Sequence, residues 1–377
     1  MSLQALSLGL YVHVPFCANL CAYCNFYKER PIKSLVQSYL FGISREWEQW
    51  KNILLQQNVS TIFLGGGSPS ILSCRDLETL CAHMKPFLPH VTEWTVEVSP
   101  TTINLEKLKV LKKSGVTRIS MGVQSFQEDV LRYLGRRQTR VQIYRAYDWI
   151  RTAGFNNVNV DLIFHPNFAD FKLWEMDLRE ADHLSPEHIS TYCLSFERQE
   201  GPFRRGHYVD EDREAAFYLH TWDWLKNHGY RHYEVSNFAR SGHVCLHNLN
   251  TWRMQEWIGL GPGAASQWHW RRFQNANNVH DWLSKRKINC VDLSEEILCA
   301  DCLIFGLRMR EGVCLDTLQK RFPLADMAKY LPLWQQFALE GFVNVHKSQL
   351  TCTDKGLLLV DALAREILGY AADNGKF

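Results

Sequence analysis

The stretch YVHVPFCANLCAYC, residues 11–24, places three cysteines within eight positions directly after a short β-rich run. Residues 10–14 have the alternating, β-branched character of a strand, so we expect Cys17, Cys21 and Cys24 to lie in a loop at its carboxyl end. Thiolates are the usual ligands of iron–sulfur clusters, and three of them in one loop can wrap around one cluster. Three protein ligands leave one iron open to an exogenous ligand, which favours chemistry over electron storage.

A structural zinc ion is the alternative occupant of the same loop. Structural zinc takes four nitrogen or sulfur ligands, and His13 is the candidate for the fourth. The spacing of the thiols alone leaves both kinds of metal site open.

Five further β-rich runs follow along the chain, separated by stretches with helical periodicity. The helical stretches include residues 34–50, 76–88 and 141–154, the last closed by a glycine. Repeated βα units predict a parallel sheet wrapped by helices, open or barrel-like, with its site at the carboxyl ends of the strands. The expected strands are residues 10–14, 60–66, 93–98, 118–123, 158–164 and 188–194.

The alternation weakens after about residue 200. Residues 212–229 predict a helix, and an aromatic, glycine-containing region that follows to about residue 280 is expected to extend the main domain. From about residue 292 the pattern predicts helices around a short hairpin, an order typical of a small winged-helix-like domain. The expected domains are residues 1–290 and 291–377.

Composition bounds the class of protein. The 377 residues are 46% hydrophobic, enough for a large core, and 42 basic residues balance 40 acidic ones, so nothing favours nucleic acid or an anionic membrane. No apolar run is long enough for a membrane span, and the chain begins without a secretion signal. The twelve cysteines are therefore expected in the reducing cytoplasm, without structural disulfides.

The cysteine motif resembles the signature of the radical-SAM superfamily, because an aromatic residue precedes the last cysteine of Cys-x3-Cys-x2-Cys. The YxHxPFC lead-in is similar to the family of oxygen-independent coproporphyrinogen III oxidases and their heme-chaperone (HemW-like) relatives. The resemblance covers nearly the whole chain. It implies an α/β fold, a parallel incomplete (β/α)6 barrel of radical-SAM type, with a small helical, winged-helix-like C-terminal domain.

The resemblance also implies the cofactors. In the family, three cysteines that match Cys17, Cys21 and Cys24 hold a [4Fe-4S] cluster, and S-adenosylmethionine (SAM) chelates the open iron. One electron from the cluster then cleaves the sulfonium of SAM to a 5′-deoxyadenosyl radical. The cofactors expected from the resemblance are therefore the cluster and SAM.

Further positions match family residues around SAM. The run GGGSPS, residues 65–70, resembles the GGGTPS loop of the family, where bare backbone can approach a ligand and offer N–H groups to a carboxylate. A glycine run after a strand is also common as a tight turn, and single polar residues at strand ends are often solvated or capping groups. The SAM-binding residues implied by the resemblance are Tyr11, Gly66, Gly67, Ser68, Glu97, Gln124, Arg136 and Asp161.

Three features favour the chaperone branch over the oxidase branch. Oxidases carry a fourth cysteine two residues after the third, whereas Asn25 and Phe26 follow Cys24 here. The motif also begins early, at residue 17, which leaves little room for the longer N-terminal segment of the oxidases. The segments YEVSNFA, residues 233–239, and HNLNTW, residues 247–252, resemble the YEISNFA and HNxxYW segments of the chaperones.

His247 is a candidate heme ligand, because a neutral imidazole can ligate heme iron and nearby aromatic residues can pack on a porphyrin face. A structural network of His247, Asn248 and Trp252 is the alternative. The first functional hypothesis is a heme chaperone that binds heme and transfers it to an acceptor protein, with an electron donor for the cluster. The second is radical decarboxylation of coproporphyrinogen III, so whether the chain is an enzyme stays open, and no catalytic residue is assigned.

The sequence departs from the family at three places. Thr251 replaces the tyrosine of HNxxYW, Gln138 stands where a histidine commonly follows LGR, and residues 164–167, FHPN, replace a glycine-containing YGLP. The bulky His165 is expected to be a solvated loop residue rather than a ligand, but can alter the pocket.

Two other features receive no functional role. Cys299 and Cys302 have the spacing of a metal pair, yet they share one face of an apolar helix and are expected to pack in a core. The winged-helix-like terminus has few basic residues, so a lid or partner surface is expected there rather than DNA binding.

Overall fold

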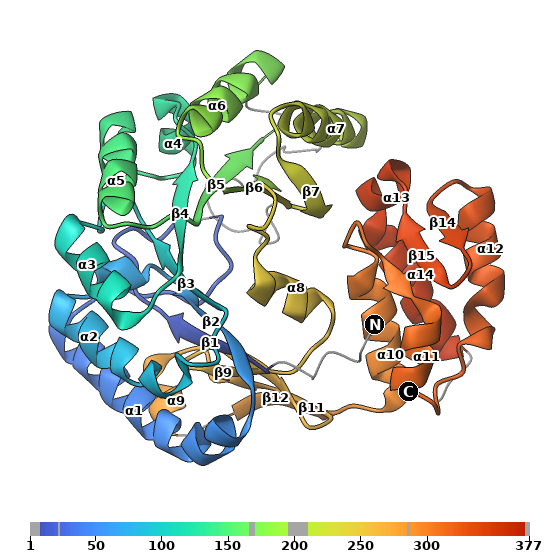
Figure 1. Cartoon of the computed structure of the whole chain (residues 1–377), viewed down its shortest axis with the longest axis horizontal. Coiled ribbons are helices and arrows are strands. Elements are labelled where there is room, and N and C mark those ends of the chain that lie inside the picture. Colours follow the sequence, from blue (N-terminus) through green and yellow to red (C-terminus); the bar gives the residue numbers. More distant parts are fainter. Residues whose placement is uncertain (1–7, 22, 166–169, 195–209, 285–286, 374–377) are drawn as a thin grey trace.

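In a computed structural model, six parallel strands form the centre of a curved twelve-stranded sheet (Figure 1). The structure describes residues 8–21, 23–165, 170–194, 210–284 and 287–373. Each of the six strands pairs in parallel with the next one in chain order. All six expected strands are confirmed: β1 (Leu8–Val14), β2 (Val59–Gly66), β3 (Glu93–Val98), β4 (Arg118–Gln124), β5 (Val158–Phe164) and β6 (His188–Cys193).

Helices from the βα units cover the convex face of the sheet (Figure 1). They are α1 (Lys33–Gln56), α2 (Cys74–Ala82), α3 (Leu105–Ser114), α4 (Glu128–Tyr133), α5 (Arg140–Thr152) and α6 (Phe171–His183). Local signals set their ends: Thr139 and Gln142 form a capping box on α5, and Gly154 follows that helix with a positive φ of 84°. The helix expected over residues 76–88 stops at Ala82, because a 3-10 turn containing Pro86 follows.

Alternation along the strands divides the sheet into an apolar outer face and a polar inner face. On β4, Ile119, Met121 and Val123 belong to the hydrophobic core, whereas Arg118 and Ser120 line the cavity on the concave side. The same alternation on β3 and β5 brings polar side chains into the interior of the barrel. The sheet is thus the incomplete (β/α)6 barrel expected from the resemblance, with a polar lumen.

Short strands from residues 231–292 extend both edges of the sheet. Helix α7 (Glu211–Asn227) leads to β7 (Arg231–Glu234) and β8 (Asn237–Ala239), which is antiparallel to β6. At the other edge β9 (Trp257–Leu260) runs parallel to β1 and is followed by the antiparallel β10 (Ala265–Trp268), β11 (Arg271–Asn275) and β12 (Lys287–Asp292). Two helices accompany them, α8 (Leu246–Trp252) and α9 (Val279–Leu283). The region extends the main sheet, as expected, but its strands were not predicted.

A buried carboxylate attaches the β9–β12 extension to the barrel. Glu46 of α1 accepts hydrogen bonds from the Gly261 N–H at 2.8 Å, from Asn275 Nδ2 at 2.7 Å and from Trp282 Nε1 at 3.1 Å. One side chain therefore pairs three donors from different parts of the extension.

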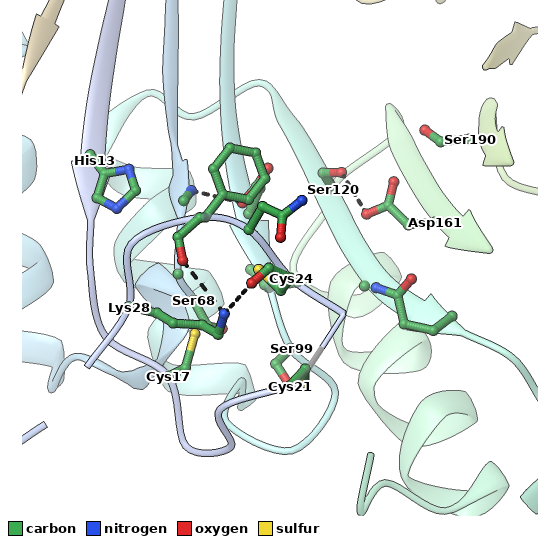
Figure 2. Close-up of a pocket in the computed structure, with 18 of the residues that line it drawn as sticks. His13, Cys17, Cys21, Cys24, Lys28, Ser68, Ser99, Ser120, Asp161 and Ser190 are labelled. Atoms are coloured by element: carbon green, nitrogen blue, oxygen red, sulfur yellow. Dashed lines mark hydrogen bonds between the residues drawn. The ribbon is translucent and has the colours of Figure 1, made fainter. Parts of the chain in front are cut away.

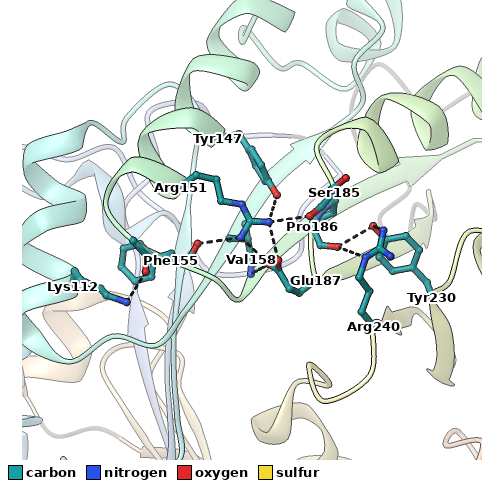
Figure 3. Close-up of polar contacts among 11 residues, drawn as sticks. Lys112, Tyr147, Arg151, Phe155, Val158, Ser185, Pro186, Glu187, Tyr230 and Arg240 are labelled. Atoms are coloured by element: carbon teal, nitrogen blue, oxygen red, sulfur yellow. Dashed lines mark hydrogen bonds and ion pairs between the residues drawn. The ribbon is translucent and has the colours of Figure 1, made fainter.

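An ion pair between Arg151 and Glu187 joins the amino ends of β5 and β6 (Figure 3), whereas the cysteine loop follows the carboxyl end of β1. The guanidinium of Arg151 binds both carboxylate oxygens of Glu187, at 2.9 and 3.0 Å, and also donates to the carbonyls of Phe155 and Ser185. Glu187 in turn accepts from the Val158 N–H. The bidentate fork therefore joins α5, β5 and β6 where no site is expected.

The C-terminal region has the expected order of helix, hairpin and helix. It comprises α10 (Glu295–Gly306), β13 (Val313–Cys314), α11 (Leu315–Arg321), α12 (Leu331–Leu339), β14 (Val343–His346), β15 (Gln349–Cys352), α13 (Asp354–Leu358) and α14 (Val360–Asp373). Backbone hydrogen bonds join it to the β7–β8 hairpin, from Val235 N to Arg308 O and from Arg310 N to Tyr233 O. The domain boundary near residue 290 stays a prediction.

The two cysteines of α10 lie in the interior of the protein. Cys299 and Cys302 are buried in the hydrophobic core, which confirms their packing role. No helix among the described residues has the length and apolarity needed to cross a membrane.

Candidate functional site

The cysteine loop leaves the carboxyl end of β1 and is closed at its base by the backbone. Cys17 N donates to Glu29 O at 2.9 Å, and Glu29 N donates to Pro15 O at 2.6 Å. Residues 17–28 therefore form a loop with fixed ends, which carries all three cysteines of the motif.

A chain of side-chain hydrogen bonds braces this loop from within. His13 Nε2 lies 2.9 Å from the carbonyl oxygen of Tyr27, so it donates there, and His13 Nδ1 accepts from the Tyr11 hydroxyl at 3.0 Å. Burial lowers the pKa of His13, which keeps the imidazole neutral. Both ring nitrogens are thereby occupied. His13 is therefore not available as the fourth ligand of a zinc site.

The three thiols face one cavity of about 910 Å³ (Figure 2). Cys21 is buried, whereas Cys17 and Cys24 are partly exposed. No group of three His, Cys, Asp or Glu side chains in the described part of the chain is gathered closely enough to hold a metal ion. Burial, then the charges of the other two thiols, raise the pKa of Cys17 to about 11, while Arg136 and Lys28 act in the opposite direction. Thiolate formation at neutral pH therefore needs further positive charge.

The glycine turn after β2 packs against the cysteine loop more closely than a side chain would permit. A Cβ on Gly67 would lie 2.6 Å from Val14 O and 2.7 Å from Phe16 O, and a Cβ on Gly66, whose φ is 95°, would overlap the His13 ring. The N–H groups of the turn are already paired, Gly67 with Val14 O, Ser68 with Phe16 O, and Gly66 with the Glu97 carboxylate. They are not free donors for a ligand, which corrects that part of the sequence interpretation.

Two carboxylates face the cavity, Glu97 from β3 and Asp161 from β5, the strands on either side of β4. Burial, then the charge of Asp161, raise the pKa of Glu97 to about 8, although the Gly66 N–H donates to Glu97 at 3.1 Å. Burial also raises the pKa of Asp161, against hydrogen bonds from Asn159 at 2.7 Å and Ser120 at 3.4 Å. Arg118 attracts both carboxylates but does not abolish their mutual repulsion, which a cationic or hydroxyl-bearing ligand would relieve further.

Gln124 and Arg136 complete the polar wall beside the thiols. Gln124 ends β4 with a positive φ of 71° after a bulge, so its side chain turns into the cavity. Arg136 donates through Nε to the Tyr23 hydroxyl at 2.9 Å and lies over the Tyr23 ring. The charged terminal nitrogens of Arg136 thus stay beside Cys17 and Cys21.

His247 enters the cavity from α8, on the other side of the lumen. It is only 8% exposed, and its Nδ1 lies 3.0 Å from Thr61 Oγ1. Burial lowers the pKa of His247 to about 4, so the ring is neutral at pH 7. Asn248 and Thr251 line the same cavity. His247 is bonded instead to other partners: its Nδ1 to Thr61, and its carbonyl, which accepts from the Thr251 hydroxyl. These bonds do not include Asn248 or Trp252, so the network of His247, Asn248 and Trp252 expected as the alternative stays a prediction.

The departures from the family pattern fall into different environments. Gln138 donates to the carbonyls of Gly122 and Val123 and so supports the end of β4. His165 is buried, 6% exposed, and contacts Tyr133, with an oxygen–nitrogen separation of 3.5 Å. The expectation of a solvated loop histidine is therefore wrong, because the ring turns inward. Residues 166 and 167 of the same segment lie outside the described residues.

The structure brings every sequence-predicted site residue to the wall of one cavity. The sequence interpretation missed further polar residues of the inner face. These polar residues alternate with the apolar residues by which the strands were recognised. The two-residue alternation of side chains along a strand was therefore the signal that could have identified them. The missed lining residues include Arg118, Ser120, Asn159 and Ser190.

Comparisons with known proteins agree with this geometry. Residues 11–177 match the radical SAM superfamily, and residues 293–359 match the HemN C-terminal domain. The chain is 31% identical to the heme chaperone HemW of Lactococcus lactis, over 93% of this chain and 94% of that protein. It is 35% identical to the heme chaperone HemW of Escherichia coli over 68% of this chain and 69% of that protein.

Among solved structures, the coproporphyrinogen III oxidase HemN of Escherichia coli, a radical SAM enzyme, superimposes with a TM-score of 0.80. The match covers 96% of this chain and 90% of that chain at 21% identity. At this identity the likeness shows a shared fold, and it confirms the barrel type expected from the sequence.

The packing of the glycine turn leads to a prediction about the cysteine loop. We expect Gly66→Ala to displace His13 and loosen the loop, lowering stability by about 1–3 kcal/mol and speeding alkylation of Cys21. Thermal melting and mass-spectrometric alkylation rates measure both effects. Gly135→Ala is the matched control, because Gly135 also has a positive φ, 69°, but no atom near its Cβ position. Equal alkylation rates in the two variants would contradict the prediction.

Proposed function

The chain belongs to the HemW family of radical SAM proteins, and we propose that it is a heme chaperone that binds heme and passes it to an acceptor protein. Membership of the superfamily implies a [4Fe-4S] cluster and SAM. The observation that carries the proposal is that the three-cysteine loop and the neutral, buried His247 line the same cavity.

Cys17, Cys21 and Cys24 are the proposed cluster ligands. The donor set fits, because it offers three thiols in a braced loop, and because His13, the nearest imidazole on the same strand, is fully hydrogen-bonded. Arg136 and Lys28 supply positive charge beside the thiols, which favours their deprotonated state. When bound, the cluster and SAM together supply one-electron reductive chemistry.

The remaining polar wall is proposed to hold SAM. Glu97 and Asp161 suit its ribose hydroxyls or its amino group, and Gln124 and Arg136 suit its carboxylate. The other proposed residues contribute differently: Tyr11 braces the loop through His13, Gly66 and Gly67 keep the turn free of side chains, and Ser68 presents its hydroxyl. This assignment leaves His247 for a second ligand.

His247 is the proposed heme ligand, through Nε2. Ligation there requires Nδ1 to keep its proton and donate it to Thr61 Oγ1, which the 3.0 Å contact permits. The low pKa of the ring means that no proton has to be displaced at neutral pH. The acceptor protein, the electron donor and a cytoplasmic location stay predictions.

The cluster assignment predicts a loss of iron in each single cysteine variant. Cys17→Ser, Cys21→Ser and Cys24→Ser should each retain well under half of the roughly four iron and four sulfide expected after anaerobic reconstitution of the wild type. Colorimetric iron and sulfide analysis measures this. Cys290→Ser is the control, because Cys290 is exposed and does not line the cavity. Full iron content in any of the three loop variants would remove that cysteine from the ligand set.

The proposed role of Glu97 predicts pH-dependent SAM binding. A carboxyl with a pKa of about 8 is mostly protonated at pH 7, and only its ionised form attracts the cationic groups of SAM. Affinity should therefore rise with pH up to about 8, by up to roughly tenfold per unit below that value. Equilibrium dialysis between pH 6 and 9 measures it. Glu97→Gln should bind SAM more weakly and lose the pH dependence, and an unchanged slope in that variant would exclude Glu97 as its source.

The function itself is tested by hemin binding and transfer. Wild-type protein should bind hemin with a Soret band of a histidine-ligated heme, and should pass it to apo-heme proteins. His247→Ala should weaken hemin binding by about tenfold or more and shift that band, whereas His280→Ala, at an exposed position, should do neither. Identical titrations of His247→Ala and wild type would show that His247 is not the ligand.

The same preparation distinguishes the chaperone from an oxidase. Anaerobic incubation with SAM, a strong reductant and coproporphyrinogen III should yield no decarboxylated porphyrinogen by mass spectrometry. Multiple turnovers of that substrate would overturn the proposed function.

A further inference from the structure

Arg118 is a buried guanidinium that forms no hydrogen bond or ion pair with the described part of the chain. It lies at the start of β4, is 2% exposed, and lines the cavity described above. Among the described residues it has no hydrogen-bond or salt-bridge partner, and its Nε is fully buried without one. Burying an unpaired charge is costly, so a guanidinium in this place suits a ligand that completes it.

The carboxylates that attract Arg118, Glu93 and Asp161, form their own hydrogen bonds with other groups. Glu93 accepts the Leu246 N–H at 2.9 Å and the His247 N–H at 3.1 Å, and so caps the amino end of α8. Asp161 accepts from Asn159 and Ser120. Burial by itself would lower the pKa of Arg118, but the nearby Cys245 thiol, and then Glu93, Tyr233 and Asp161, keep that pKa above its ordinary value. The fork of N–H donors on Arg118 therefore stays charged and open.

Among the described residues, two other cations line the cavity: Lys28 of the cysteine loop, and Arg136, which contacts that loop through Tyr23. Lys28 donates to Cys24 O, and Arg136 donates to the Tyr23 hydroxyl. Arg118 lies at the amino end of β4, close to Glu93 and hence to the amino end of the helix that carries His247. Within the described lining, Arg118 is thus the cation placed beside the proposed heme ligand rather than beside the thiols.

We propose that Arg118 binds a carboxylate of the cargo, one propionate of heme, within the barrel. A guanidinium and a carboxylate match in a bidentate pair, which orients a porphyrin as well as holding it. The inference rests on the proposed function and adds the group that recognises the heme edge while His247 holds its iron. The carboxylate of SAM is the other source of the same chemistry.

Comparison of hemin with its dimethyl ester tests the proposal on wild-type protein. Esterification removes both propionate charges and leaves the iron and the ring unchanged. Wild type should bind hemin about tenfold or more tightly than the ester, because a charge-assisted pair is lost with the ester. Equal affinity for the two would overturn the inference. Binding of neither would overturn the proposed function and the inference with it.

Two variants, Arg118→Gln and Arg118→Lys, test whether Arg118 is the source of the preference for hemin over its ester. The glutamine variant should lose the preference for hemin over the ester and keep the affinity for the ester, and the lysine variant should fall between. An equal loss for both ligands would mean that Arg118 serves only to balance the charges of the lumen, and would overturn the inference. SAM binding to the same variants identifies the carboxylate, since lower SAM affinity with an unchanged hemin-to-ester ratio would assign it to SAM.

Discussion

The close contact between the glycine turn after β2 and the chain that leaves β1 is the constraint on which the site depends. The N–H groups of Gly67 and Ser68 bind the carbonyls of Val14 and Phe16, so the cysteine loop starts from a fixed backbone. The space beside Gly66 is filled by His13, whose two hydrogen bonds reach both β1 and the far end of the loop. Because hydrogen bonds fix both ends of the cysteine loop and His13 supports it from β1, the loop is ordered before any ligand binds. This order lowers the entropic cost of binding a ligand within the loop.

A second constraint arises from the two-residue period of the strands. Because the outer residues of each strand pack under helices, the inner residues are free to be polar, and the barrel encloses charges that would otherwise destabilise it. Hydrogen bonds offset part of this cost: Asn159 donates to Asp161 and accepts from His188, which in turn accepts from the Tyr233 hydroxyl. The rest of the cost remains in the raised pKa of Glu97 and in Arg118, whose buried Nε has no hydrogen-bond partner among the described residues. Both features lie where ligands are proposed to bind.

The sequence predicted the centre of the fold and most of the candidate site. Six strands were found because each is a compact apolar run, and the cysteines because their spacing is rare outside metal sites. The strands of residues 231–292 were missed because they have three to six residues and polar faces, so they depend on pairing within the sheet that β1 and β6 anchor. His165 was misjudged because a loop position says little about burial. Arg118 was overlooked because an arginine at a strand end usually lies in solvent.

Helix α8 connects these features. Its amino end is capped by Glu93 of β3, its His247 bonds to Thr61 of β2, and the Cys245 N–H before it donates to Tyr233 of β7. The carbonyl of Tyr233 also accepts from Arg310, beyond α10 in the C-terminal region. A ligand that draws on both His247 and Arg118 would therefore act on one helix and on the strands that hold it. The β7–β8 hairpin therefore contacts both α8 and the C-terminal region. Through this hairpin the C-terminal region is attached to the part of the barrel where the cargo is proposed to bind. The attachment accounts for the position of the C-terminal region at the open side of the barrel (Figure 1).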